Sequence, residues 1–328
     1  MTTSPAAPDA TPAAPAALSA GTVPPARSAA PPTGGAAGPA ALPAPRRQVP
    51  GAVLVLVAMC LLHTGSALAT ELFATLGPAG TTWLRLTFAA LLLVAFTGPS
   101  LWRTLRATGR RDLVATVLLG AVSAGMMLLF SEAAARLPLG TATALEFLGP
   151  LTVAVIASRR PREVAWLALA AAGVVLLTSP WTGATSLPGV MFGLGSAACW
   201  ALYVIGTAHV GSRLPAPHAL AVSLAVAAVV AAPFGAPAAV GGLTWETAIA
   251  ALGIAVLMPL LPFLLEMQAL QRIGKTTYGT LAGLEPAVSL VAAMILIAQT
   301  PMPLQIAGTL LVVAAGIGAT RAEARANR

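Results

Sequence analysis

Four ionisable side chains interrupt long apolar runs in this sequence: Arg85, Glu146, Glu266 and Glu285. A charge inside an apolar membrane helix costs about 2.5 kcal/mol or more, so each needs a partner or a wet cavity. Together they offer what a zwitterion needs: Glu146 or Glu285 for an ammonium group, and Arg85 or the N–H groups of broken helices for a carboxylate. Burial also disfavours the charged form of a carboxylate, which suits proton uptake and release. The three glutamates are therefore also the candidates for proton coupling.

Each of these glutamates lies close to a proline, which has no N–H to donate to the carbonyl four residues earlier. Pro150 thereby leaves the backbone carbonyl of Glu146 itself without its helical partner. The four candidate helix breaks are Pro150, Pro259, Pro262 and Pro286. Opened backbone is tolerated at membrane depth only where it is buried in protein or lines a cavity, so the pattern predicts a water- or substrate-filled chamber. The alternative is that the prolines kink helices for packing and the glutamates form structural pairs.

The remaining candidate site residues carry two interpretations each. Arg85 either extends to the membrane surface or pairs with a carboxylate such as Glu146. His63, alone in an apolar run, is either a hydrogen-bonded packing residue or a substrate-site residue. Trp200 and Tyr203 either stack on one side of a ligand or pack between helices.

The composition decides the broad class. Hydrophobic residues make up 57% of the 328 residues and charged residues 9%, with a mean hydropathy of +0.86. A soluble domain has about 25% charged residues, so this chain is expected to be a polytopic, all-α membrane protein in the lipid bilayer. The net charge of +8 does not indicate nucleic acid, because the arginines occupy short gaps between apolar runs.

Ten apolar runs have about the length that a spanning helix needs. They cover residues 50–69, 80–97, 112–130, 139–158, 164–180, 187–208, 217–235, 247–267, 277–298 and 302–320. With the N-terminus inside, the clusters Arg103–Arg111, Arg159–Arg162, Arg213, Arg272–Lys275 and Arg321–Arg328 all fall on the cytoplasmic side. The other side receives Glu71, Arg136, Glu132 and Glu246. This asymmetry follows the positive-inside rule and predicts ten helices with both termini cytoplasmic.

The chain also shows signs of an internal repeat. The neighbourhood of Arg136 and Pro150 recurs around Arg272 and Pro286 at a constant offset of 136 residues. Five helices per half require the second copy to be inverted, as in many secondary transporters. The expected organisation is a disordered, Ala/Pro-rich cytoplasmic tail (1–45), a first repeat (46–180), a second repeat (181–321) and a short basic tail (322–328).

Motifs for catalysis or ATP use are not found in the sequence, so an enzyme is not expected. There is no H-E-x-x-H, no G-x-S-x-G, no Walker A loop and no Asp-rich motif. Cys60 and Cys199 lie in apolar runs without metal-ligand or disulfide spacing. No metal and no cofactor is expected, and any energy for transport would come from an ion or substrate gradient.

Four stretches of the chain carry a family resemblance. They are ALEFLGPLTVAVIASRRP (Ala144–Pro161), ACWALY (Ala198–Tyr203), PLLPFLLEMQAL (Pro259–Leu270) and YGTLAGLEPAV (Tyr278–Val288). Over nearly all of 50–320 the chain resembles the threonine/homoserine exporter branch of the EamA-type drug/metabolite transporter superfamily. The resemblance implies a plasma-membrane exporter of small amino acids that exchanges them for protons. One departure is Gln299, where family members usually carry glutamate.

The leading hypothesis is therefore a proton antiporter in the bacterial cytoplasmic membrane that exports small hydrophilic amino acids such as threonine or homoserine. A second hypothesis keeps the fold but exports cationic or aromatic drugs and metabolites, since Trp200 with a carboxylate suits a cation. A third is a membrane scaffold without transport of its own. The sequence leaves the oligomeric state open, a homodimer included.

Overall fold

The computed structural model describes residues 49–158, 163–179, 181, 185–210, 214–270, 272–273 and 275–326. The expected tail 1–45 and the cytoplasmic residues Arg159, Arg160, Arg162, Arg213 and Arg328 lie outside this part of the chain. All the regular secondary structure of the described residues is helical, which confirms the predicted all-α class.

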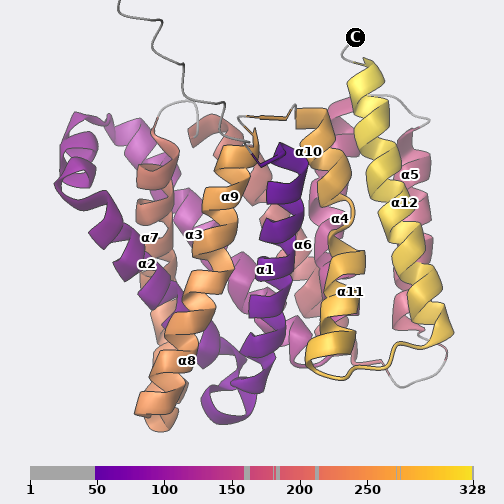
Figure 1. Ribbon diagram of the computed structural model, residues 1–328, viewed down its shortest axis with the longest axis horizontal. Coiled ribbons are helices and arrows are strands. Elements are labelled where there is room, and N and C mark those ends of the chain that lie inside the picture. Colours follow the sequence, from indigo (N-terminus) through magenta and orange to yellow (C-terminus); the bar gives the residue numbers. More distant parts are fainter. Residues whose placement is uncertain are drawn as a thin grey trace, which may run out of the picture. The chain divides into compact units, whose positions relative to one another are not determined.

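The helices follow the predicted apolar runs (Figure 1). In the first half they are α1 (Gly51–Glu71), α2 (Phe73–Ala107), α3 (Arg110–Ala134), α4 (Leu139–Ser158) and α5 (Val164–Thr178). The second half holds α6 (Leu187–Val210), α7 (Ala216–Gly242), α8 (Trp245–Ala255), α9 (Leu261–Leu270), α10 (Lys275–Ala282), α11 (Glu285–Leu296) and α12 (Pro303–Ala326). Among the described residues, nine segments are long and apolar enough to span a membrane, and α5 is a shorter apolar helix.

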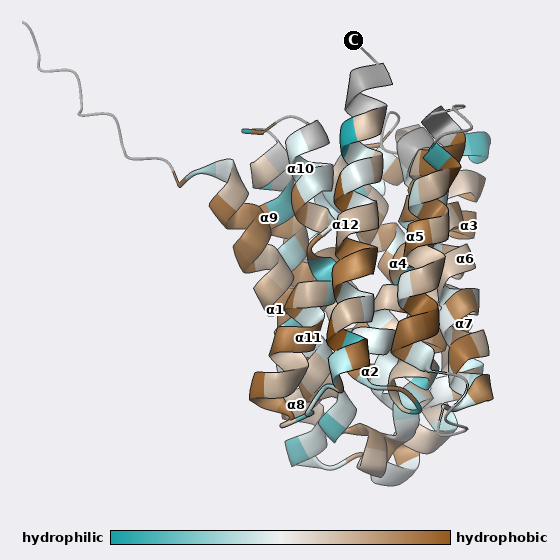
Figure 2. Cartoon of the chain, turned by 90° about the vertical axis from the view of Figure 1, so that its right-hand side faces the viewer, coloured by the Kyte–Doolittle hydropathy of each residue, from teal (hydrophilic) through white to brown (hydrophobic). Residues whose placement is uncertain are grey.

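Large apolar side chains cover the outward helix faces, as a lipid environment requires. Phe96, Val229 and Ile295 are each more than 70% exposed, on α2, α7 and α11 respectively. In Figure 2 hydrophobic residues occupy much of the helices, and hydrophilic residues lie toward several of the helix ends. An exposed apolar surface of this extent would be unstable in water and identifies a protein embedded in the bilayer.

Two spanning segments are interrupted at mid-length. Between α8 and α9 the chain makes a π-helical turn, Val256–Leu260, in which Met258 has an extended backbone (φ −158°, ψ 107°) just before Pro259. Between α10 and α11 the helix stops at Gly283 and Leu284, and Pro286 lies in the first turn of α11. These interruptions match the positions expected for Pro259 and Pro286, and Pro262 lies in the first turn of α9.

The break expected at Pro150 is wrong, because α4 continues without interruption to Ser158. A single interior proline removes one backbone hydrogen bond, and tight packing on neighbouring helices can hold the remaining ladder in place. The apolar run 80–97 is also longer in the structure. The segment α2 is kinked at Gly77 (φ 68°) and Gly98 (φ 54°), whose non-helical backbone is one that L-residues before proline rarely take; Pro78 and Pro99 directly follow these two kinks.

Helices of the first half pack on helices of the second half. The main contacts join α2 with α7, α3 with α6 and α7, α4 with α6 and α11, α5 with α12, and α1 with α9 and α11. Such interleaving is what two inverted repeats would produce, and the division at 180/181 stays a prediction. The packing of the two halves places the inner faces of α1–α4 opposite those of α6–α11.

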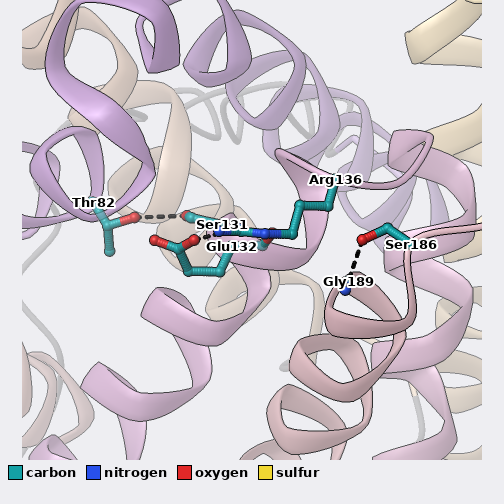
Figure 3. A network of polar contacts seen from close by, with 6 residues as sticks. All are labelled: Thr82, Ser131, Glu132, Arg136, Ser186 and Gly189. Atoms are coloured by element: carbon teal, nitrogen blue, oxygen red, sulfur yellow. Dashed lines mark hydrogen bonds and ion pairs between the residues drawn. The ribbon is translucent and has the colours of Figure 1, made fainter.

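Polar contacts secure the two ends of this bundle. At one end Arg136 pairs with Glu132 on α3 (Figure 3). The Arg136 guanidinium also lies 4.9 Å from the centre of the Phe192 ring on α6. Nearby, the Thr82 and Ser131 hydroxyls are 2.6 Å apart and join α2 to α3. At the other end Arg272 donates to the backbone carbonyl of Val49 at 2.6 Å.

Candidate functional site

The inner faces of the helices enclose a cavity of about 290 Å³, which we call the chamber. This volume lies at the lower end of the ~300–1,000 Å³ of ligand pockets and suits a small molecule. Nine of the eleven predicted site and helix-break residues line it: His63, Arg85, Glu146, Trp200, Tyr203, Pro259, Pro262, Glu266 and Glu285. The other two, Pro150 and Pro286, do not line it.

Glu146 projects from α4 toward α6. Its Oε1 accepts a hydrogen bond from the Ser196 hydroxyl at 2.6 Å, and the same hydroxyl lies 2.9 Å from the carbonyl oxygen of Met126 on α3. This arrangement needs a close approach of α4 and α6. A Cβ on Gly149 would lie 2.2 Å from the carbonyl oxygen of Ala197, so only glycine fits there.

Arg85 is 2% exposed and lies on the inner face of α2. Its Nη1 donates to the sulfur of Met258 at 3.0 Å, whereas Nε and Nη2 have no hydrogen-bond partner in the described structure. Extension to the membrane surface, one of the two sequence interpretations, is therefore wrong. Arg85 belongs to the helical stretch of α2 between the kinks at Gly77 and Gly98, and its side chain lines the chamber.

The other interpretation was that Arg85 pairs with a carboxylate such as Glu146. A direct ion pair between these two side chains is not formed in the described structure. Both side chains line the chamber and each lies within the electrostatic field of the other. A thioether is a weak acceptor for a guanidinium, so a strong acceptor is missing beside two adjacent N–H donors. A carboxylate is an acceptor that matches these two donors.

His63 lies on α1 and is 3% exposed. Neither ring nitrogen has a hydrogen-bond partner in the described part of the chain, so the interpretation as a hydrogen-bonded packing residue is wrong. One turn further along α1, the Ser66 hydroxyl is 3.3 Å from the sulfur of Met258. Met258 therefore contacts both Ser66 and Arg85 from the interrupted α8–α9 segment.

Two further glutamates come from the interrupted helices. Glu285 is buried and is the first residue of α11, where the helix dipole favours a negative charge. Glu266 on α9 has Tyr278 of α10 within hydrogen-bonding reach. The electrostatic fields of Glu266 and Glu146 both reach Glu285. The chamber thus concentrates three acidic side chains against one guanidinium.

The aromatic pair lies on α6. Trp200 packs edge-on against Phe147 of α4, with ring centres 6.3 Å apart and planes at 71°. Trp200 and Tyr203 also line the chamber, so the packing role of Trp200 and a ligand-stacking role are compatible.

Gln299 lies away from the chamber lining. Its side-chain oxygen accepts a hydrogen bond from the backbone N–H of Leu139, the first residue of α4, at 3.1 Å. An acceptor at this point satisfies one of the free N–H groups of a helix start, and a glutamate would do the same. The departure from glutamate at this position therefore concerns the start of α4 and leaves the acidic residues of the chamber intact.

Sequence reasoning missed several polar lining residues. Ser66, Ser123, Thr143 and Tyr278 line the chamber, and Thr143 is 2.8 Å from the Ser289 hydroxyl of α11. Hydroxyls are common in membrane helices because they can bond within their own helix, so their presence gave no signal. Met258 was missed because a methionine does not stand out by residue type in an apolar run.

The described residues hold no group of three or more His, Cys, Asp or Glu side chains that could bind a metal ion. A buried guanidinium with two free donors and three carboxylates in one small space can receive both ends of a zwitterion, or a proton in place of the cationic end.

Comparisons with known proteins identify the relatives of this chain. Residues 187–320 match the EamA-like transporter family. The threonine/homoserine exporter RhtA of Escherichia coli K12 is 37% identical over 286 residues, which cover 85% of this chain and 95% of the relative. The exporter of the same name from Salmonella typhimurium LT2 is also 37% identical with the same coverage.

A solved structure described as the crystal structure of a protein is similar in fold, with a TM-score of 0.57 over 82% of this chain and 96% of its own. At 18% identity this likeness concerns the fold alone. The extended similarity to the curated exporters decides the family. The chain belongs to the EamA-like transporter family of the drug/metabolite transporter superfamily, on the threonine/homoserine exporter branch.

Proposed function

We propose that this protein exports small hydrophilic amino acids of the threonine and homoserine type by exchange for protons across the bacterial cytoplasmic membrane. The observation that carries the proposal is the unpartnered Nε and Nη2 of buried Arg85 in a chamber that also holds Glu146 and Glu285. Relatives named as threonine/homoserine exporters support the choice of substrate.

The carboxylate of the amino acid binds Arg85. Nε and Nη2 lie on one edge of the guanidinium and present parallel donors, the geometry in which arginine holds a carboxylate with two hydrogen bonds. His63 offers a further nitrogen beside the same chamber, and its unpartnered ring supports a role in this contact. Nε and Nη2 of Arg85 then each donate to a carboxylate oxygen.

The ammonium group of the amino acid binds a carboxylate, Glu146 or Glu285. A proton on that carboxylate removes the charge that attracts the ammonium group, so proton and substrate compete for one site. Such competition makes the cycle an exchange, because one ligand leaves before the other binds. Glu266, nearer the turn between α9 and α10, is placed to pass protons between the chamber and that end of the bundle.

Alternating access follows from the two halves of the chain. Two inverted repeats offer equivalent gates to both sides of the membrane around a central site. The interrupted segments α8–α9 and α10–α11 both contribute to the chamber lining, as discontinuous helices of secondary transporters do.

Transport by the purified protein in proteoliposomes tests the proposal. With threonine inside and an acidic outside, wild type should release threonine about ten-fold faster than without a pH gradient. Glu146→Gln and Glu285→Gln should lose this acceleration, while Glu246→Gln, exposed in the first turn of α8, should keep it. Unchanged gradient-driven efflux in both chamber variants would exclude the mechanism and favour a scaffold.

The apolar part of the chamber supports one alternative. Met126, Met127, Phe130 and Phe263 line it together with Trp200, and thioethers with aromatic rings suit an apolar cation. An exporter of cationic or aromatic compounds would show ligand-induced thermal stabilisation with those compounds and none with threonine or homoserine. The amino-acid proposal expects the reverse pattern.

A further inference from the structure

The Ser196 hydroxyl is fully buried between three helices and faces two acceptors at once. Its Oγ lies 2.6 Å from Oε1 of Glu146 on α4 and 2.9 Å from the carbonyl oxygen of Met126 on α3. A serine hydroxyl has one proton to donate and two lone pairs to accept with. It can therefore donate to only one of these two acceptors at a time.

The two choices correspond to the two protonation states of Glu146. When Glu146 is ionised, the hydroxyl donates to the carboxylate, a charge-assisted bond. When Glu146 carries a proton, the carboxyl O–H donates to Ser196 Oγ, and the hydroxyl turns about its Cβ–Oγ bond to donate to the Met126 carbonyl. Every polar group keeps a partner in both states, and no heavy atom has to move.

We propose that Ser196 is a hydroxyl switch that lets Glu146 gain and lose a proton at almost constant geometry. The proton on Glu146 comes from the chamber and returns to it; the Ser196 proton only changes its acceptor. This role rests on the proposed proton exchange and adds a positioning residue to it. Without the switch, one of the two states would leave a buried polar atom unsatisfied, which costs about 1–3 kcal/mol.

The backbone holds these three groups at fixed spacing. Met126 is an interior residue of α3, so its carbonyl oxygen keeps a second lone pair for Ser196 beyond its helical bond. The close contact between Gly149 and Ala197, next to Ser196, sets the separation of α4 and α6.

Other titratable groups surround Glu146 from the elements packed around the chamber. They are His63 on α1, Arg85 on α2, Cys199 and Tyr203 on α6, Glu266 on α9, Tyr278 on α10 and Glu285 on α11. Among the described residues, none of these groups forms a hydrogen bond with the Glu146 carboxylate, whereas Ser196 does. A change at Ser196 therefore acts on Glu146 directly.

The test is the pH profile of threonine exchange in proteoliposomes at equal pH on both sides. Ser196→Ala should move the midpoint of the profile by about one to two units to higher pH, because the ionised form loses a charge-assisted bond and the neutral form loses a weaker one. Thr207→Val is the matched control, since the Thr207 hydroxyl on the same helix bonds only to carbonyls of its own helix. That variant should leave the midpoint unchanged.

Difference infrared spectra between acid and neutral pH give a readout that does not depend on transport. The band of the protonated carboxyl group that disappears in Glu146→Gln belongs to Glu146. In Ser196→Ala this band should shift to higher frequency because its O–H loses an acceptor, and Ser196→Thr should return it toward the wild-type position.

The outcomes separate the switch from the proposed function. If wild type shows no proton-driven exchange, the proposed function fails, and the infrared shift still tests the hydrogen bond. If wild type is proton-driven but folded Ser196→Ala keeps both the pH midpoint and the band position, the switch is overturned. A mere loss of thermal stability with an unshifted profile has the same consequence, because it is what a packing role predicts.

Discussion

At the scale of single residues, Arg85 and His63 have an arrangement that stability alone would not favour. Both are almost fully buried, yet two nitrogens of each lack a hydrogen-bond partner in the described structure. A buried charge without a full set of partners destabilises a protein by several kcal/mol, and such groups concentrate where a ligand completes them. In the proposed site, the carboxylate of a bound substrate would supply the acceptors for Arg85.

The incomplete hydrogen bonding of buried Arg85 predicts opposite effects of its removal on protein stability and on substrate binding. Arg85→Gln should raise the melting temperature of the substrate-free protein, since it removes an incompletely paired charge. It should also raise the KM for threonine by about 10- to 100-fold through loss of two charge-assisted hydrogen bonds. Arg85→Lys should recover little, because an ammonium group lacks the parallel donors.

Transport kinetics and thermal unfolding of the detergent-solubilised protein measure both effects, with the exposed Arg103→Gln as control. A folded Arg85→Gln variant with unchanged KM would show that the substrate carboxylate binds elsewhere.

At the scale of elements, the contact between α4 and α6 decides the geometry of the chamber. Gly149 lets the two backbones approach, Ser196 reaches Glu146 across the contact, and Phe147 packs on Trp200 from the same face. The neighbouring Pro150 leaves α4 unbroken from Leu139 to Ser158, so Glu146 lies within a continuous helix. The interrupted segments on the opposite side supply Met258 and Glu285 instead.

Gly149→Ala should therefore disturb both stability and transport. The added methyl group would lie 2.2 Å from the Ala197 carbonyl oxygen, and such overpacking costs about 1–3 kcal/mol. Gly253→Ala is the matched control: its methyl group meets nothing within 4 Å, and alanine in an exposed helix is expected to stabilise by about 0.5–1 kcal/mol. Equal melting temperatures of the two variants would contradict a tight α4–α6 contact.

At the scale of the whole molecule, charge orients the bundle. The exposed arginines Arg103, Arg106, Arg110 and Arg111 lie at the junction of α2 and α3, whereas Glu132 and Glu246 lie at the opposite helix ends. Figure 1 places the end of α9, the start of α10 and the C-terminus on one side of the bundle. The positive-inside rule predicts that the end of the bundle with the α2–α3 arginines faces the cytoplasm.

Cysteine labelling in intact cells tests this orientation. In a background without Cys60 and Cys199, the Glu246→Cys variant should react with a membrane-impermeant maleimide added outside. The Arg103→Cys variant should react only after the membrane is permeabilised. The reverse pattern would place both termini outside and would invert the direction proposed for transport.

Composition and apolar runs were enough to predict a polytopic membrane protein, its spanning helices and the charged residues inside them. A chain with 9% charged residues has too few to cover a water-exposed surface, and apolar runs of spanning length form helices because lipid offers no backbone partners. The rarity of charge in such runs also made Arg85, Glu146 and Glu285 conspicuous. These are local or compositional properties, so no knowledge of packing was needed.

The contacts between these side chains could be seen only in the folded protein. That Arg85 bonds to Met258, that Ser196 reaches both Glu146 and Met126, and that Gln299 caps α4 depend on contacts between helices far apart in the chain. Rotation and depth of each helix are set by its packing against neighbours, and apolar runs do not encode them. For the same reason the continuity of α4 through Pro150 could be seen only in the folded bundle, where adjacent helices support it.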